Sequence, residues 1–212
     1  MIVKWIECQV EEDHKTKFSE AQEKWAKTKD VPGFIAQTGG WDSIYPEKAY
    51  IIAFWEDEES LREFMLNDHD NLYDETNQAG TYEKLTINYF TSQTELHGDA
   101  DSLLDAIEHS FFLRAVNCIV RSNGTKHFEN VQKSVWLPGF KKADGMQGGL
   151  FSKSQGEQNH YHLSAFWDYP ESNNKFEKSE LLSLRKIAAV NEDILSLDVA
   201  LVDIEESWKV IP

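Results

Sequence analysis

The chain has 212 residues, and its 37 Asp and Glu against 21 Lys and Arg give a formal net charge of −16. This acidity excludes nucleic acid and anionic membranes as natural partners, because both attract basic surfaces. No run of about 20 apolar residues is present to span a bilayer, and Lys4 and Glu7 interrupt the N-terminal segment, unlike a signal peptide. Two cysteines form no disulfide framework, so we expect a cytoplasmic protein.

Four short segments recur in the same order in the two halves of the chain. They are Cys8 with Cys118, Pro-Gly-Phe at 32–34 and 138–140, Gly-Gly at 39–40 and 148–149, and Ala-Phe-Trp at 53–55 and 165–167. Their spacing varies only between 106 and 112 residues, which indicates a duplicated unit of about 90 residues. We therefore predict a first repeat over 1–91, an acidic connector over 92–110 and a second repeat over 111–212.

In the first repeat, β-rich segments predict strands over 3–10, 34–44, 50–55 and 82–90. A helix is expected over 14–27, because Phe18, Ala21 and Trp25 recur at steps of three and four. Pro32-Gly33 would end this helix. The acidic residues 56–59 favour the start of a second helix, where negative charge meets the positive end of the helix dipole.

The connector and the second repeat are interpreted in the same way. Asp101 is expected to cap a short connector helix that carries Leu103, Leu104 and Ile107. The second repeat should contain strands over 111–121, 140–152, 160–167 and 196–204, with helices over 125–136 and 170–190. Each repeat then has the βαββαβ order of a ferredoxin-like unit.

The strand over 50–55 is apolar on both faces, since Tyr50, Ile52 and Phe54 alternate with Ile51, Ala53 and Trp55. Helices can cover only one face, and the sheet of the other repeat is the simplest cover for the second. We therefore predict an α+β fold in which tandem ferredoxin-like βαββαβ repeats form an intramolecular pseudo-dimeric α/β barrel. The protein would be a monomer, and a homodimer or a partly exposed face are the alternatives.

These motifs resemble the dimeric α/β-barrel superfamily of antibiotic-biosynthesis-monooxygenase-like proteins. The whole chain, including the start Lys4-Trp5-Ile6-Glu7-Cys8-Gln9-Val10, is most similar to the bacterial YdbC-like family of unknown function. The resemblance implies cofactor-independent oxygenation of a small aromatic substrate, oxidative haem breakdown, or ligand binding without catalysis. The haem-degrading members use an Asn, a Trp and a His, whereas this chain has Glu7 to Gln9 and Phe64 at the first two places.

A pocket for a small flat apolar ligand is predicted in the first repeat, between helices and sheet. His69 lies between Asp68 and Asp70 and is the candidate proton carrier; a solvated helix face is the alternative. Position 181 of the second repeat holds Leu at the matching place, so the site would be asymmetric. The expected lining residues are all aromatic: Trp5, Trp25, Trp41, Phe54 and Phe64.

The remaining candidates point to packing rather than chemistry. His160 and His162 share one strand face, but no third metal ligand can be named, so we predict no metal site. Cys8 and Cys118 are expected in the core. Because no glycine-rich phosphate loop is present, we expect no cofactor. Function thus stays open between an enzyme and a non-catalytic binding or structural protein, with haem binding or degradation as a lesser alternative.

Overall fold

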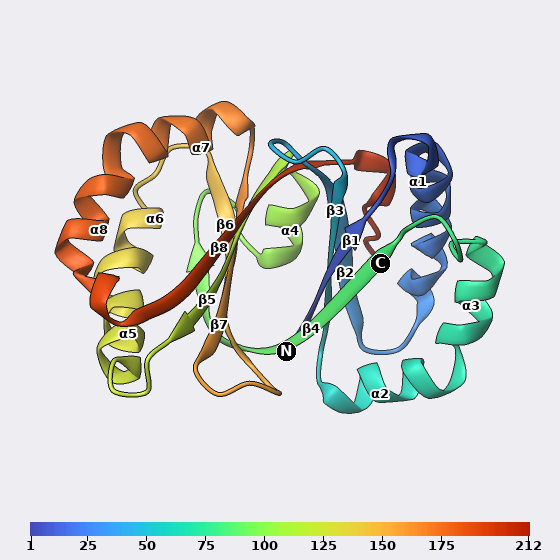
Figure 1. Ribbon diagram of the computed structural model, residues 1–212, viewed down its shortest axis with the longest axis horizontal. Coiled ribbons are helices and arrows are strands. Elements are labelled where there is room, and N and C mark those ends of the chain that lie inside the picture. The colour runs from blue at the N-terminus through green and yellow to red at the C-terminus, as the bar shows by residue number, and fades with distance from the viewer. The chain divides into compact units, whose positions relative to one another are not determined.

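The computed structural model describes all of residues 1–212, which divide into two compact units (Figure 1). Unit 1 comprises Met1–Tyr89 and Val202–Pro212, and unit 2 comprises Phe90–Leu201. The C-terminal residues lie in unit 1 because the end of the last strand pairs there, with Ile204 opposite Gly40. No helix is both long and apolar enough to cross a membrane.

The sheet of unit 1 has the hydrogen-bonded order β4-β1-β3-β2-β8. Its strands are β1 (Ile2–Gln9), β2 (Phe34–Asp42), β3 (Lys48–Trp55), the first part of β4 (Lys84–His97) and the end of β8 (Ile194–Ile204). Figure 1 shows helices on one face of this sheet. They are α1 (Lys15–Glu23), α2 (Glu58–Asn67) and α3 (His69–Thr76), and 3₁₀ turns at Glu12–His14 and Lys24–Asp30 flank α1.

The sheet of unit 2 has the order β8-β5-β7-β6-β4, with β5 (Phe112–Val120), β6 (Met146–Ser154) and β7 (His160–Trp167) as its own strands. Helices α5 to α8 lie on one face of it in Figure 1. They are α5 (Thr125–Val131), α6 (Leu137–Phe140), α7 (Pro170–Phe176) and α8 (Leu182–Ala188), joined by π-helical segments Gln132–Trp136 and Glu177–Leu181. A short helix, α4 (Leu103–Glu108), precedes β5.

Both units have the expected order of strands and helices, and the α+β class of ferredoxin-like repeats in an α/β barrel is confirmed. Every residue of β3 from Ala49 to Trp55 is buried, so both faces of this strand are covered, as its sequence predicts. Asp57 caps α2 by accepting a hydrogen bond from the Ser60 amide, which agrees with the acidic start expected for this helix.

The segment Leu137 to Phe140 differs from its prediction. Its proline was expected to end the helix and its phenylalanine to begin a strand, but the helix continues through Phe140 and the strand begins at Met146. Pro138 stands at the start of α6, directly after the π-helical segment Gln132–Trp136, so the helix changes its hydrogen-bonding pattern where the proline lacks an N–H donor. The turn that corresponds to Gly33 (φ 77°) lies instead at Gly145 (φ 79°), because both positions need a left-handed backbone.

The paired glycines are also not equivalent in the two units. Phe34 pairs with Trp55 as Met146 pairs with Trp167, which fixes a spacing of 112 residues along β2 and β6. Gly39 and Gly40 then correspond to residues 151–152 rather than to 148–149. Gly148 has a separate role, because a Cβ there would lie 2.9 Å from the Cβ of Ala106 on α4.

The connector contains more strand than predicted. β4 continues to His97, seven residues beyond the expected end of the strand, and pairs with β6 over Phe90 to His97. The connector helix is present as α4, but Ser102 rather than Asp101 caps it, since the Ser102 hydroxyl accepts a hydrogen bond from the Asp105 amide.

Candidate ligand-binding cavities

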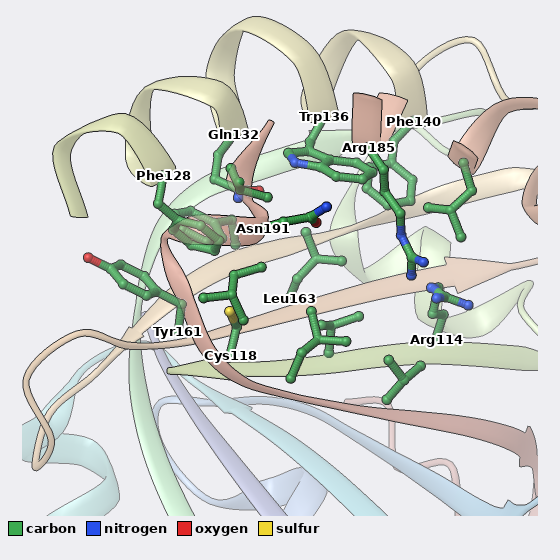
Figure 2. Close-up of a pocket in the computed structure, with 17 residues that line it drawn as sticks. Arg114, Cys118, Phe128, Gln132, Trp136, Phe140, Tyr161, Leu163, Arg185 and Asn191 are labelled. Atoms are coloured by element: carbon green, nitrogen blue, oxygen red, sulfur yellow. The ribbon is translucent and has the colours of Figure 1, made fainter. Parts of the chain in front are cut away.

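Unit 2 contains a cavity of about 300 Å³ between its helices and its sheet (Figure 2). Figure 2 shows Phe128, Gln132 and Trp136 reaching down from the helices toward Leu163 and Cys118 on the strands. The rest of the lining is mostly apolar. It includes Val116, Phe140, Phe151, Leu181, Val190, Ile194, Leu197 and Val199.

Local periodicity explains why these residues share a cavity. Phe128, Gln132 and Trp136 are spaced by four residues, so they lie along one helix face. On β5, Arg114 and Cys118 are separated by an even number of residues and therefore point to the same face of the sheet. The cavity thus occupies the space between a helix stripe and a strand face.

Two arginines supply positive charge at one end of this cavity. The Arg114 side chain is 5% exposed and forms an ion pair with Glu177. Burial lowers the pKa of Arg114, while the carboxylate of Glu177 acts in the opposite direction. Arg185 reaches toward Arg114 in Figure 2 and has no carboxylate partner. This end of the cavity can therefore accept an anionic group.

The other end carries a phenol and a thiol in their neutral forms. The Tyr161 hydroxyl donates to Glu129 Oε1 over 2.7 Å, and Lys153 Nζ donates to the same oxygen over 3.0 Å. Burial and this carboxylate raise the pKa of Tyr161. Burial raises the pKa of Cys118 to about 12, so its thiol is not a thiolate near neutral pH. Neither group is activated as a nucleophile.

Unit 1 contains a smaller cavity of about 110 Å³. Three of the predicted site residues line it: Trp25, Phe64 and His69. The His69 ring centre lies 5.6 Å from that of Trp25 and 5.8 Å from that of Phe64. Nδ1 of His69 lies 2.9 Å from a carboxylate oxygen of Asp70, and the side chain is 19% exposed. The imidazole therefore belongs to an aromatic cluster and has a carboxylate neighbour.

The other three predicted lining residues lie elsewhere in unit 1. Trp5 stacks on Tyr50, with ring centres 5.0 Å apart, and neither it nor Phe54 lines the cavity. Alternation along β3 turns Phe54 away from the face that carries Ala53 and the cavity. Trp41 packs against Trp208 and Phe18.

The two cavities occupy corresponding positions in their units, and the one in unit 2 was not predicted from the sequence. A spacing of 112 residues relates Tyr73 to Arg185 and Tyr82 to Ile194, and each of these residues lines its own cavity. Two tyrosines in unit 1 are thus replaced in unit 2 by an arginine and a smaller aliphatic side chain, in agreement with the larger cavity there. The same spacing revealed the repeat and could have pointed to the second cavity.

His160 and His162 do not lie in a group of three or more His, Cys, Asp or Glu side chains that could hold a metal ion. Nδ1 of His162 lies 2.9 Å from Oδ1 of Asn117, and the Phe90 ring lies beside both imidazoles at 5.0 Å. Burial lowers the pKa of His162 to about 3. This histidine is a neutral core residue.

Residues 2–90 match a family described as Domain of unknown function (DUF4937). A curated relative, the uncharacterized protein YdbC of Bacillus subtilis, is 33% identical over 92 residues, which are 42% of this chain and 77% of YdbC. The chain belongs to this YdbC-like family. The resemblance seen in the sequence is thereby confirmed, and the family itself has no assigned function.

Solved structures share the fold of this YdbC-like chain. A candidate monooxygenase from Lactobacillus acidophilus has a TM-score of 0.75 at 14% identity, covering 99% of this chain and 95% of its own. An anthrone oxidase-like protein has a TM-score of 0.74 at 10% identity, covering 96% and 91%. The haem-degrading enzyme LmHde of Listeria monocytogenes has a TM-score of 0.50 at 10% identity, covering 94% and 98%. At these identities the likeness establishes the fold and not the reaction.

Proposed function

We propose that this YdbC-like protein binds a flat apolar molecule with an anionic edge in the cavity of unit 2. The observation that carries the proposal is a largely apolar cavity of about 300 Å³ with the unpaired Arg185 at one end. A cavity of roughly 150 Å³ holds benzene, so this volume suits two fused rings. Trp136, Phe140 and Phe128 supply aromatic surface for such rings.

Titration calorimetry with 2-naphthoate tests this proposal. Leu163→Trp fills the cavity and is expected to abolish binding. Arg185→Met removes the unpaired cation and should weaken 2-naphthoate binding about tenfold, because a charge-assisted contact is lost. Arg62→Met, which removes an exposed arginine of unit 1, is the matched control and should leave affinity unchanged. Undiminished binding to Leu163→Trp would contradict the proposal.

A second candidate is the monooxygenase-like reaction in unit 1 that the sequence suggests, with His69 as proton carrier. It is favoured by the cluster of His69, Trp25 and Phe64 at the smaller cavity. Oxygen uptake with a small 1,3-diketone, which suits a cavity of about 110 Å³, is the measurement, and His69→Ala should slow it at least about tenfold. The exposed His127→Ala serves as the control. Equal uptake by His69→Ala and the native protein would remove this candidate.

Haem fits the residues of unit 2 poorly. Haem iron needs a His, Cys thiolate, Met or Tyr ligand, and no histidine or methionine lines the cavity. Cys118 is a thiol and Tyr161 is hydrogen-bonded to Glu129. We therefore rank haem below an organic ligand, with a non-catalytic binding or structural role as the remaining alternative. We also propose that the protein is a cytoplasmic monomer without nucleic-acid or membrane partners.

A further inference from the structure

Lys4 is a buried amine without a counterion. It is 7% exposed, and the contact of its Nζ is with Sδ of Met65 at 3.8 Å. The corresponding residue of unit 2 is Arg114, because both pair with the central alanine of their sheets, Ala53 and Ala165. Arg114 has the carboxylate of Glu177, whereas position 65, which is 112 residues earlier, carries a thioether. Unit 1 therefore has a cation at this position, Lys4, but no carboxylate to pair with it.

Lys4 lies at the floor of the smaller cavity beside a second buried polar group. Lys4 and Gln37 are both in register with Ala53, one from β1 and one from β2, and all three line the cavity. Gln37 is 7% exposed, and its side-chain nitrogen has no hydrogen-bond partner. Because Ala53 is small, an open space separates an amine from an amide donor on one sheet face.

The surroundings of Lys4 favour the neutral amine. Burial lowers its pKa to about 8, so about one molecule in ten carries a neutral, nucleophilic amine at pH 7. An ordinary lysine with a pKa near 10.4 is neutral in fewer than about one in a thousand. The walls above it are aromatic, with Trp55 and Phe64 stacked at 4.8 Å.

We propose that Lys4 is a nucleophile that forms an imine with a small aliphatic aldehyde or ketone held in the cavity of unit 1. The Nζ lone pair attacks the carbonyl carbon while Gln37 donates a hydrogen bond to the carbonyl oxygen. Both amine protons pass to that oxygen, water leaves, and a C=N bond replaces the C=O bond. A volume of about 110 Å³, below the roughly 150 Å³ that holds benzene, limits the ligand to a few carbon atoms.

Reductive trapping tests the proposal on the native protein, with butanal as the probe and cyanoborohydride as the reductant. Intact mass is expected to show butylation, and peptide mapping should place a butyl group on Lys4, with any label on the α-amine of Met1 counted separately. Lys4 should be labelled at least about tenfold faster than the exposed Lys17 at pH 7. The rate at Lys4 should rise with a midpoint near pH 8.

Three variants distinguish the nucleophile, the positioning residue and the nonspecific labelling of exposed lysines. Lys4→Met should lose the label and Lys17→Met should keep it. Gln37→Leu should slow labelling several-fold without moving the pH midpoint, as expected for a positioning residue. Labelling spread over exposed lysines with Lys4 unmodified in the native protein would overturn the proposal. Binding of butyrate without formation of any butanal adduct would also overturn the proposal, because the cavity would then be an anion site. Neither result affects the naphthoate test of unit 2.

Discussion

Replacement of Lys4 by Met is expected to stabilise the protein by about 3 kcal/mol at pH 7. The amine is 7% exposed and its pKa falls from 10.5 to about 8, so folding moves a charge into an apolar site at a cost. Methionine has a similar length and no charge, and its thioether can pack on Met65 and Phe64. Most substitutions of buried residues destabilise a protein, so a gain would be diagnostic.

The pH dependence of this gain has a definite sign. Because the folded-state pKa of Lys4 lies below its unfolded value, the native protein gains stability as the pH rises from 8 toward 10.5. The advantage of Lys4→Met should therefore shrink over that range and vanish above it. Urea unfolding of both proteins between pH 7 and 10 measures this, with Lys17→Met as a control within about 0.5 kcal/mol of the native protein. A loss of stability in Lys4→Met at pH 7 would show that the folded protein compensates the charge.

The second large effect is a loss of stability in acid that originates at His162. This histidine is fully buried, and its pKa is lowered from 6.5 to about 3. Between these values the unfolded chain binds a proton that the folded chain does not, so stability falls as the pH falls from 6.5 toward 3. From pH 6.5 to 4 the contribution of this one residue is about 3 kcal/mol.

His162→Gln isolates this contribution. The glutamine amide can donate to Oδ1 of Asn117, as the imidazole can, but it does not titrate. The variant should therefore show a shallower decline of unfolding free energy between pH 6.5 and 4 than the native protein. His97→Gln changes an exposed histidine and is the matched control. Identical pH slopes for His162→Gln and the native protein would contradict a buried neutral His162.

The order of elements could be predicted from the sequence, with errors where one residue type allows two structures. The strand over 160–167 was predicted with its observed ends, because apolar alternation between turn signals is a local property. Pro138 was misinterpreted because proline suits both a helix start and a turn. The continuation of β4 to His97 depends on pairing with β6, which its own residues do not reveal.

The candidate sites could be predicted only in part. Trp25 and Phe64 lie on apolar helix faces, and such faces must meet the sheet, so their place at a cavity follows from periodicity. Which face of β3 the helices cover could not be derived, and this choice excludes Phe54. The volume of a cavity is the small difference between the space that the helices and the sheet enclose and the volume of the side chains that fill it. Neither cavity volume could therefore be predicted from the sequence.

By itself, the sequence determined the two ferredoxin-like repeats, the acidic character and membership of the YdbC-like family. Only the tertiary structure decided that the larger cavity lies in unit 2 and that Lys4 is buried without an acid. Hydrophobic periodicity acts within a turn or a strand and is therefore readable locally. The surroundings of a charged side chain depend on distant residues, since Lys4 meets Met65 across 61 positions and Arg114 meets Glu177 across 63. Burial and pairing of this kind set the free energy of a charge, and they exist only in the folded chain.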